Sequence, residues 1–430
     1  MLAILGALTI VILLILIMTR SVSAVVALII VPLVTALIAG FRGEIITFMT
    51  DGIKSISPTG VMFIFAIMFF GVLTDAGTFR PIIRRLIILA GKDPARVAVA
   101  TAILAMIVHL DGSGAVTFLV TIPAMLPLFD ALNMKRTTLA TIVALSAGTM
   151  NILPWGGPTL RAASALEVEV TTLFNPILIP VMVGLLTVLW IAFLLGKRER
   201  KYLSGHSQAD LQAEVLATTT SELERPRLLW LNIIFILISI SLLLSGLIPP
   251  HIIFMVAFAV AITVNYPNVK LQGERINAHA PAALLMAGIL FAAGCFTGIL
   301  KGSGMTDAMA QATVAFIPGT MGRHLAFITG LFSMPLSLVF DPDSFYFGIL
   351  PLLANVATQF GGEAIEVGRA AVMGQMTTGF PISPLTGSTY LLIGLAGVDM
   401  GDHQRKTIPY AFLITVVILL VSVFIGAISF

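Results

Sequence analysis

Two short stretches rich in proline and glycine decide the fold: residues 151–159 (NILPWGGPT) and residues 379–388 (GFPISPLTGS). Each lies inside an apolar segment long enough to cross a membrane, at 137–166 and at 366–397. Proline removes a backbone donor and breaks a helix, and glycine weakens one. Both segments are therefore predicted to be helices that are broken at the middle of the membrane.

The apolar segment before each broken helix is interrupted as well. Segment 97–130 contains the polar sequence HLDGSG at 109–114, and segment 323–360 contains FDPDS at 340–344. Each segment is too long for a single crossing of about 20 residues. We therefore predict two re-entrant hairpins, each of which enters and leaves the membrane by the same face.

The composition of the whole chain is that of a membrane protein. Of its 430 residues, 58% are apolar and only 10% are charged, whereas a soluble protein carries about 25% charged residues. The apolar runs are continuous, unlike the alternating pattern of an outer-membrane barrel. The composition predicts an all-α polytopic membrane protein, embedded in the lipid bilayer.

The interruptions recur at a nearly constant offset. Asp111 and Asp341 are 230 residues apart, and Pro154 and Pro381 are 227 apart. We predict two repeats, 1–196 and 228–430, joined by a hydrophilic cytoplasmic linker at 197–227. Each repeat would have five crossings and one hairpin, so the second would be inverted. Inverted repeats with broken helices are typical of secondary transporters.

The basic residues predict the orientation. In this topology 18 of the 24 Lys and Arg residues fall on one face, five fall on the other and Arg161 stays inside the membrane. By the positive-inside rule the first face is cytoplasmic and both termini lie outside. We expect a multi-pass protein of the inner (cytoplasmic) membrane of a prokaryote.

Three acids lie at the hairpin tips: Asp111, Asp341 and Asp343. An aspartate at such a place can cap the half-helix that follows it, and Pro342 suits the first helical position. An ionised carboxylate inside a membrane is costly, however, and this favours function. The acids are therefore also predicted to serve a divalent metal ion of the Mg or Ca type, a proton, or both.

The breaks carry groups that suit an anion. Half-helices predicted to start at Thr159 and Thr386 would present free N–H groups and the positive end of the helix dipole. Arg161 offers donors to a carboxylate, unless it is held in a structural pair with an acid such as Glu167. His109 could relay protons but is more often structural, and His251, His279, His324 and His403 carry no signal.

The remaining candidate substrate-binding residues surround the tips and the breaks, and some of their hydroxyls are expected only to satisfy freed backbone groups. They are Ser113, Gly114, Asn151, Gly156, Gly157, Pro158, Thr159, Ser344, Ser383, Thr386, Gly387, Ser388 and Thr389. No catalytic triad, P-loop or zinc spacing is present in the sequence, so no enzyme activity, no nucleic-acid partner and no tightly bound cofactor are expected.

At residues 110–128, 150–161, 345–351, 388–392 and 401–405 the sequence resembles the citrate–divalent-metal:proton symporter family, a branch of the ion transporter superfamily. The run PWGGPTLR at 154–161 is its most specific part. The resemblance implies an elevator-type fold, a homodimer, and uptake of citrate as a complex with a divalent metal, driven by protons. The chain departs from the family pattern at Ser113, at Asp341 and at Thr386-Gly387.

The sequence thus predicts a secondary active transporter that imports citrate, or a related di- or tricarboxylate, as a divalent-metal complex coupled to protons. A sodium-coupled di- or tricarboxylate carrier of the same fold is the first alternative. An anion channel is less favoured, and a membrane enzyme would need a nucleophile and base that the sequence does not offer.

Overall fold

The computed structural model describes residues 1–430 except Arg20, Arg80, 82–84, 87, 89, 90, Lys92, 201–221, 315–321 and Arg323. Most of the predicted linker 197–227 therefore lies outside the described residues, as do the basic residues Arg20, Arg80, Arg84, Lys92, Lys201 and Arg323. Every regular element in the described part of the chain is helical. The predicted all-α class is confirmed.

The first half begins with three helices, followed by a hairpin, a broken helix and a last long helix. Its elements are α1 (Leu2–Met18), α2 (Ala24–Ala39), α3 (Ile45–Asp75), α5 (Pro94–Val108), η1 (His109–Asp111), α6 (Gly114–Ala131), α7 (Arg136–Met150), α8 (Gly157–Ala165), α9 (Val170–Phe174), η2 (Asn175–Ile177) and α10 (Leu178–Glu199).

The second half repeats this order. Its elements are η4 (Pro226–Leu228), α12 (Leu229–Ser245), α13 (Pro250–Asn265), α14 (Val269–Gly302), α15 (Met305–Val314), α17 (Leu325–Leu336), η5 (Ser344–Ile349), α18 (Leu350–Gln359), α19 (Ala364–Val372), η6 (Phe380–Ile382), α20 (Gly387–Ala396) and α21 (Met400–Phe424). The hairpins are α5–α6 and α17–α18, and the broken helices are α7–α8 and α19–α20, close to the predicted positions.

Seven helical segments in the described part are long and apolar enough to cross a membrane. They are Ile45–Asp75, Pro94–Asp111, Gly114–Ala131, Val170–Glu199, Pro226–Ser245, Val269–Gly302 and Met400–Phe424. Shorter apolar helices include α2 and α13. A polytopic membrane protein is thus supported. The two arms of the first hairpin are themselves long enough to cross, so its re-entrant topology and the ten crossings stay predictions.

Several predicted boundaries were wrong. Hydropathy predicts two further membrane spans at 58–76 and 281–300, but these are parts of the longer helices α3 and α14. Their first turns contain charged residues such as Lys54 and Arg275, which hydropathy excludes but which a helix that extends beyond the apolar core of the membrane tolerates. The break in the second half, expected from residue 379, already begins after α19 ends at Val372. No proline marks that earlier end.

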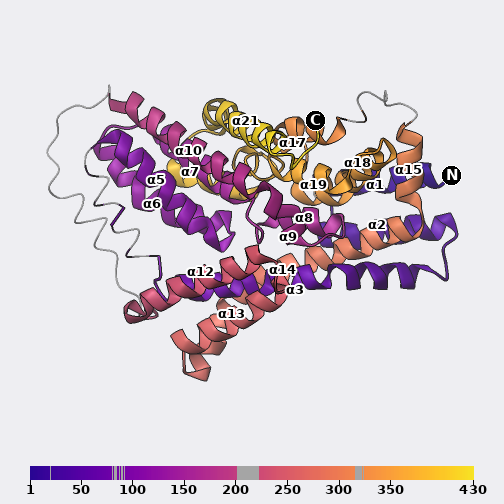
Figure 1. Cartoon of the computed structure of the whole chain (residues 1–430), viewed down its shortest axis with the longest axis horizontal. Coiled ribbons are helices and arrows are strands. Elements are labelled where there is room, and N and C mark those ends of the chain that lie inside the picture. Colours follow the sequence, from indigo (N-terminus) through magenta and orange to yellow (C-terminus); the bar gives the residue numbers. More distant parts are fainter. Residues whose placement is uncertain are drawn as a thin grey trace.

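Two groups of helices are visible in Figure 1. Helices α3, α12, α13 and α14 form a layer along the lower side of the view, and α5, α6, α7, α10 and α21 lie above its left part. The short helices α8 and α9 lie between these groups, near the centre. The broken helix of the first half therefore ends against this layer, which we call the α3–α14 layer. Helix α8 packs on two of its helices, α3 and α14.

Helices α3 and α14 pack closely because glycines face each other. A Cβ atom on Gly52 of α3 would overlap the carbonyl oxygen of Gly294 on α14, and a Cβ on Gly298 would overlap the Phe48 carbonyl oxygen. Small residues allow two helix backbones to approach in this way. The glycines thus determine the distance between the two longest described helices.

We predict that Gly52→Ala destabilises the protein by about 1–3 kcal/mol, because the added methyl group must push α3 away from α14. The thermal unfolding midpoint of the purified protein in detergent should fall. Gly273→Ala, also on α14, is the matched control because no atom lies within 4 Å of a Cβ there. Equal midpoints for the two variants would contradict the close packing.

Candidate functional site

The two helix breaks contact each other directly. The side chain of Asn151, just after α7, donates from Nδ2 to the carbonyl oxygen of Met376 at 2.8 Å. Met376 lies in the second break with a positive φ of 51°, a conformation that few residues other than glycine adopt. Its own N–H donates to Oγ of Ser337 at 2.8 Å. Both polar groups of this peptide region are thus held by side chains from other elements.

The first hairpin tip lies against both breaks. Trp155, in the first break, donates from Nε1 to the carbonyl oxygen of Leu110 at 2.8 Å. The ring of Phe380, in the second break, packs against Gly114. A Cβ atom on Gly114 would lie only 2.6 Å from the nearest atom of this ring. The tip between α5 and α6 is therefore enclosed by the chain segments that interrupt α7–α8 and α19–α20.

We predicted that Asp111, the acid at this tip, caps α6, but it does not. Ser113 is the N-cap residue, and its Oγ accepts a hydrogen bond from Val116 N at 3.3 Å. Asp111 lies two residues earlier and accepts from Ser113 N at 2.8 Å. The glycine between them, Gly112, has φ of 74°. This turn moves Asp111 out of the capping position, and a single backbone hydrogen bond to its carboxylate remains.

The acids of the second tip have different partners. Asp341 accepts from the N–H groups of Asp343 and Ser344 at 3.0 and 3.1 Å and from the Ser344 hydroxyl at 2.5 Å. Its predicted capping role, with Pro342 as the first helical residue, is confirmed. Asp343 accepts from Nε of Arg161 at 2.7 Å, and the two side chains are only 11% and 8% exposed.

The partner of Arg161 is an acid, as the structural alternative expected, but it is Asp343 and not Glu167. Glu167 instead pairs with Lys301. Arg161 lies on α8 and Asp343 at the tip between α17 and α18, so the pair joins the first broken helix to the second hairpin. The guanidinium also lies against Gly157, where a Cβ atom would be 2.9 Å from the Arg161 side chain. Glycine at this position leaves room for the arginine.

The half-helices begin slightly earlier or later than predicted. Helix α8 begins at Gly157, with Gly156 as its N-cap residue and Pro158 in its first turn, so Thr159 is not its first residue. Helix α20 begins at Gly387 and Thr386 is its N-cap residue. Proline is allowed in a first turn because its missing N–H has no partner there anyway.

Several predicted ligand hydroxyls bond to freed backbone carbonyls. Thr159 donates to Ile152 O at 2.9 Å. Thr386 and Thr389 both donate to Phe380 O at 2.9 Å, and Ser383 donates to the carbonyl oxygen of Ser337 at 2.5 Å. These hydroxyls satisfy backbone groups that the breaks leave without a helical partner, as we expected for some of them.

Two residues of the last helix, which sequence reasoning passed over, support the second break. His403 is buried, and its Nε2 lies 2.9 Å from the carbonyl oxygen of Pro381. Since a carbonyl only accepts, Nε2 carries the hydrogen. The neighbouring Gln404 donates from Nε2 to Ile382 O at 2.9 Å. The polar run at 402–404 inside an otherwise apolar last segment was the available signal.

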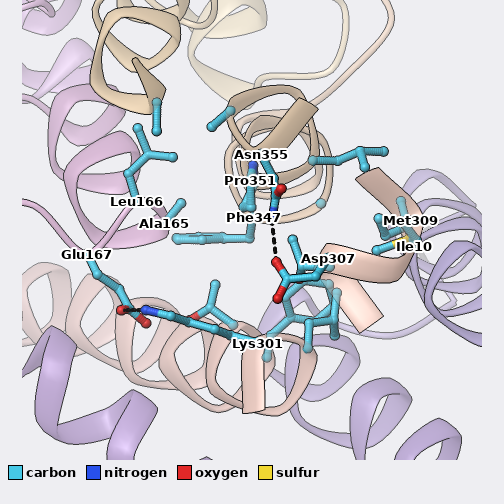
Figure 2. A pocket seen from close by; sticks show the side chains of 18 of the residues that line it. Ile10, Ala165, Leu166, Glu167, Lys301, Asp307, Met309, Phe347, Pro351 and Asn355 are labelled. Atoms are coloured by element: carbon cyan, nitrogen blue, oxygen red, sulfur yellow. Dashed lines mark hydrogen bonds and ion pairs between the residues drawn. The ribbon is translucent and has the colours of Figure 1, made fainter. Parts of the chain in front are cut away.

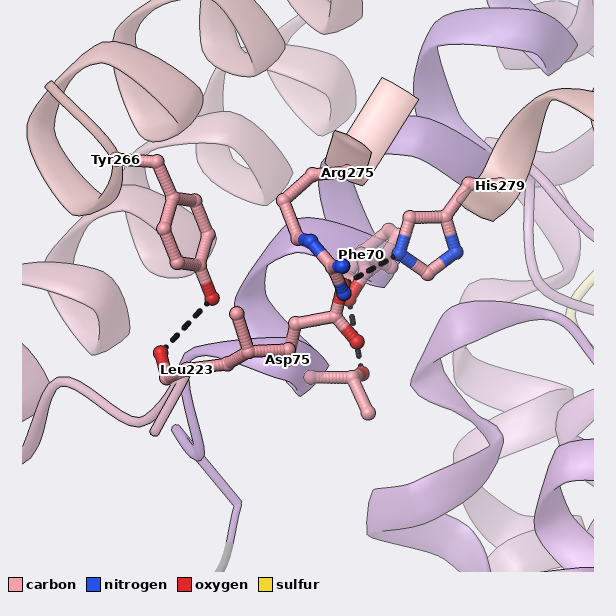
Figure 3. A network of polar contacts seen from close by, with 7 residues as sticks. Phe70, Asp75, Leu223, Tyr266, Arg275 and His279 are labelled. Atoms are coloured by element: carbon pink, nitrogen blue, oxygen red, sulfur yellow. Dashed lines mark hydrogen bonds and ion pairs between the residues drawn. The ribbon is translucent and has the colours of Figure 1, made fainter. Parts of the chain in front are cut away.

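A second polar network lies between α3 and α14 (Figure 3). Asp75 accepts from Nη1 of Arg275 at 3.3 Å and from Nε2 of His279 at 2.8 Å. One turn before Asp75, the ring of Phe70 stacks on Trp155 with centroids 5.2 Å apart. His279, which we expected to carry no signal, thus helps fix the end of α3 that contacts the first break.

The contacts connect the two tips, the two breaks and the buried Arg161, and each tip carries at least one acid. Such a set can receive carboxylate groups at Arg161 and at the start of α8, and a cation at Asp111 or Asp341.

Comparison with solved structures shows the same fold in two bacterial membrane transporters. The Alcanivorax borkumensis YdaH transporter has a TM-score of 0.63 and 15% identity, over 91% of this chain and 89% of that one.

The second is Neisseria gonorrhoeae MtrF, an antimetabolite efflux pump, with a TM-score of 0.62 and 14% identity over 90% of this chain and 85% of that one. The chain therefore shares its fold with these two transporters. The sequence shows the family. The model of the family described as "Citrate transporter" matches residues 5–374, and the chain belongs to this family.

Two relatives from Bacillus subtilis (strain 168) align over essentially their full lengths. One, named "Citrate transporter", is 45% identical over 430 residues and is covered completely, as is this chain. The other, named "Mg(2+)/citrate complex secondary transporter", is 40% identical over 432 residues, covering 100% of this chain and 99% of the relative. Both relatives are named as transporters, which points away from an enzyme.

We predict that His403→Leu destabilises the protein, because it leaves the buried Pro381 carbonyl without its donor, at a cost of about 1–3 kcal/mol. His403→Gln, which keeps an amide donor, should lose less. The readout is the thermal unfolding midpoint in detergent, with His251→Leu as the control at the start of α13. A leucine variant as stable as the glutamine variant would argue against the His403 hydrogen bond.

Proposed function

We propose that this protein imports citrate, or a related di- or tricarboxylate, as a complex with a divalent metal ion, coupled to protons. The observation that carries the proposal is that contacts connect the two hairpin tips to the two broken helices. Asn151 with Met376, Trp155 with Leu110, and Arg161 with Asp343 connect these four segments. Membership of the citrate transporter family and the relative named for Mg(2+)/citrate support the choice of substrate.

The charges suggest how such a complex is bound. Citrate carries about three negative charges at neutral pH, and a bound divalent cation leaves roughly one. Arg161 and the first N–H groups of α8, near Gly157 and Thr159, are proposed to bind carboxylate oxygens. Asp111 and Asp341 are proposed to bind the metal or the coupling protons, and Asp343 would join them when Arg161 turns to the substrate.

The polar side chains around these charges divide into two groups. Thr159, Ser383, Thr386 and Thr389 already bond to backbone carbonyls, so in the proposal they hold the breaks open. The other candidates remain proposed substrate contacts, through the side chains of Ser113, Asn151, Ser344 and Ser388 and through the backbone at Gly114, Gly156, Pro158 and Gly387. Asn151 would combine both roles because it also binds Met376.

The remaining architecture is proposed from the sequence and the fold. The two halves would be inverted repeats in the cytoplasmic membrane of a prokaryote, with both termini outside. A homodimer would keep one group of helices fixed while the group that carries the tips and breaks moves across the membrane. The α3–α14 layer on one side, and the helices that lie above it in the view (α5–α7, α17–α19 and α21) on the other, fit such a division (Figure 1).

The proposal predicts that uptake of radiolabelled citrate into proteoliposomes requires a divalent cation. Uptake should rise when magnesium, calcium or zinc is added, because the metal reduces the charge that enters the membrane. Citrate should accumulate against its gradient when the external pH is lower than the internal pH, and a protonophore should abolish this. Uptake that needs sodium but no divalent metal, or flux without accumulation, would overturn the proposal.

We predict that Asp111→Asn changes the coupling without disrupting the tip. The asparagine keeps an oxygen that can accept from Ser113 N but cannot exchange a proton or carry a charge. The increase of uptake at lower external pH should therefore weaken or disappear. Asp51→Asn, on the exposed part of α3, should behave as wild type. Wild-type pH dependence in the Asp111 variant would remove this residue from the coupling role.

A further inference from the structure

A cavity of about 290 Å³ lies beside the proposed site (Figure 2). On one side it is lined by α1, α14 and α15, and on the other by the end of α8, η5 and α18. Ala165 and Phe347 form part of its wall, and each lies four residues, or about one helical turn, beyond a member of the buried Arg161–Asp343 pair. The cavity thus approaches that pair from the side of the molecule where α14 ends.

Two polar pairs line the opposite parts of this cavity. Lys301 at the end of α14 pairs with Glu167, which follows α8. Asn355 of α18 donates from Nδ2 to Asp307 of α15 at 2.6 Å. Figure 2 shows both pairs, with Lys301 and Asp307 on neighbouring parts of the wall. Lys301 and Asp307 lie on one side of the cavity, and their partners Glu167 and Asn355 lie on the other. A ligand in the cavity would therefore meet the ammonium group of Lys301 and the carboxylate of Asp307 together.

Glu167 is held in an unusual backbone conformation. Its φ is 55°, in the left-handed region that costs energy for residues other than glycine and is often found at functional sites. Its side chain lines a second cavity of about 240 Å³, next to Pro249 and His251, as well as the first one. The conformation places the carboxylate between the two cavities and opposite Lys301.

The pair between Glu167 and Lys301 can be opened easily. The lysine side chain is 69% exposed and that of Glu167 is 22% exposed. Exposed lysine–carboxylate pairs contribute little to stability, because water competes for the charged groups, and Lys301 is the well-exposed member of this pair. A carboxylate brought by a ligand can therefore replace Glu167 at Lys301. The same exchange at the buried Arg161–Asp343 pair would require both charges to be compensated.

We infer that this cavity is an entry site that binds the metal–carboxylate complex before it reaches the buried pair. Lys301 binds a carboxylate group of the complex in place of Glu167, and Asp307, oriented by Asn355, presents oxygens to the cation. This inference rests on the proposed function, because it takes the same substrate. It adds a second, outer site whose residues are separate from the tips and breaks.

Substitutions at the two members of the Lys301–Glu167 pair are expected to change the KM in opposite directions. Lys301→Met removes the charge that attracts the carboxylate, so the KM for magnesium citrate should rise by about fivefold with kcat unchanged. Glu167→Gln removes the competitor for Lys301, so the KM should fall. Lys301→Arg should stay close to wild type. A pair that serves only stability would shift both neutral variants in the same direction.

The measurement is the initial rate of magnesium-dependent citrate uptake by cells, corrected for the amount of protein in the membrane. Lys54→Met is the matched control, since Lys54 is also an exposed lysine (74%) that pairs with an acid, Asp51. Asp307→Asn should raise the KM for magnesium citrate as Lys301→Met does, because the cation loses its oxygens. KM values that do not change at Lys301, or that change in the same direction at Glu167, would overturn the entry site.

The two failures can be told apart within one experiment. If the wild-type protein does not take up citrate with magnesium, the proposed function fails. If it does, but the KM does not change in the Lys301→Met variant, or changes in the same direction in the Glu167→Gln variant, only the entry site fails.

Discussion

The hydrogen bond from Asn151 to the carbonyl of Met376 joins the two halves of the chain at the breaks of their interrupted helices. A helix that breaks inside a membrane leaves N–H and C=O groups without partners, and lipid supplies none. Each such group must be bonded by other parts of the protein. Here the first break supplies the donor for a carbonyl group of the second, so the second interruption depends on the first for this bond.

The same requirement explains most of the polar residues around the breaks. Ser337 accepts from Met376 N, His403 donates to Pro381 O, and Gln404 donates to Ile382 O. These donors and acceptors come from α17–α18 and α21, so the second hairpin and the last helix are needed to keep the break open. Ser337, His403 and Gln404 therefore stabilise the irregular backbone of the second break.

The sequence located the interruptions well because their causes are local. Pro154, Pro158, Pro381 and Pro384 cluster with glycines at the two breaks, and Gly112 gives the first tip its positive φ. The earlier end of α19 at Val372 was missed because its cause is not local. The residues after it leave the helix to reach Asn151, Ser337 and other distant partners, and no proline marks the change.

Pairing was harder to predict for the same reason. Glu167 is close to Arg161 in the sequence and was the natural choice of partner, yet Asp343, on the other half of the chain, takes that place. Sequence distance says little once two hairpins and two broken helices meet. The acids of the tips could be identified from the cost of burying a charge, but which of them binds the arginine depends on the folded geometry.

The Arg161–Asp343 pair also restricts what kind of substrate can enter the proposed site. Removing one member of a buried pair costs about 3–5 kcal/mol, because the other charge is left uncompensated. A free carboxylate could take over Arg161 but would leave Asp343 without a cation. A free metal ion would have the opposite defect. A complex that carries both a carboxylate and a divalent cation can replace both partners at once, and this favours metal–citrate over either component alone.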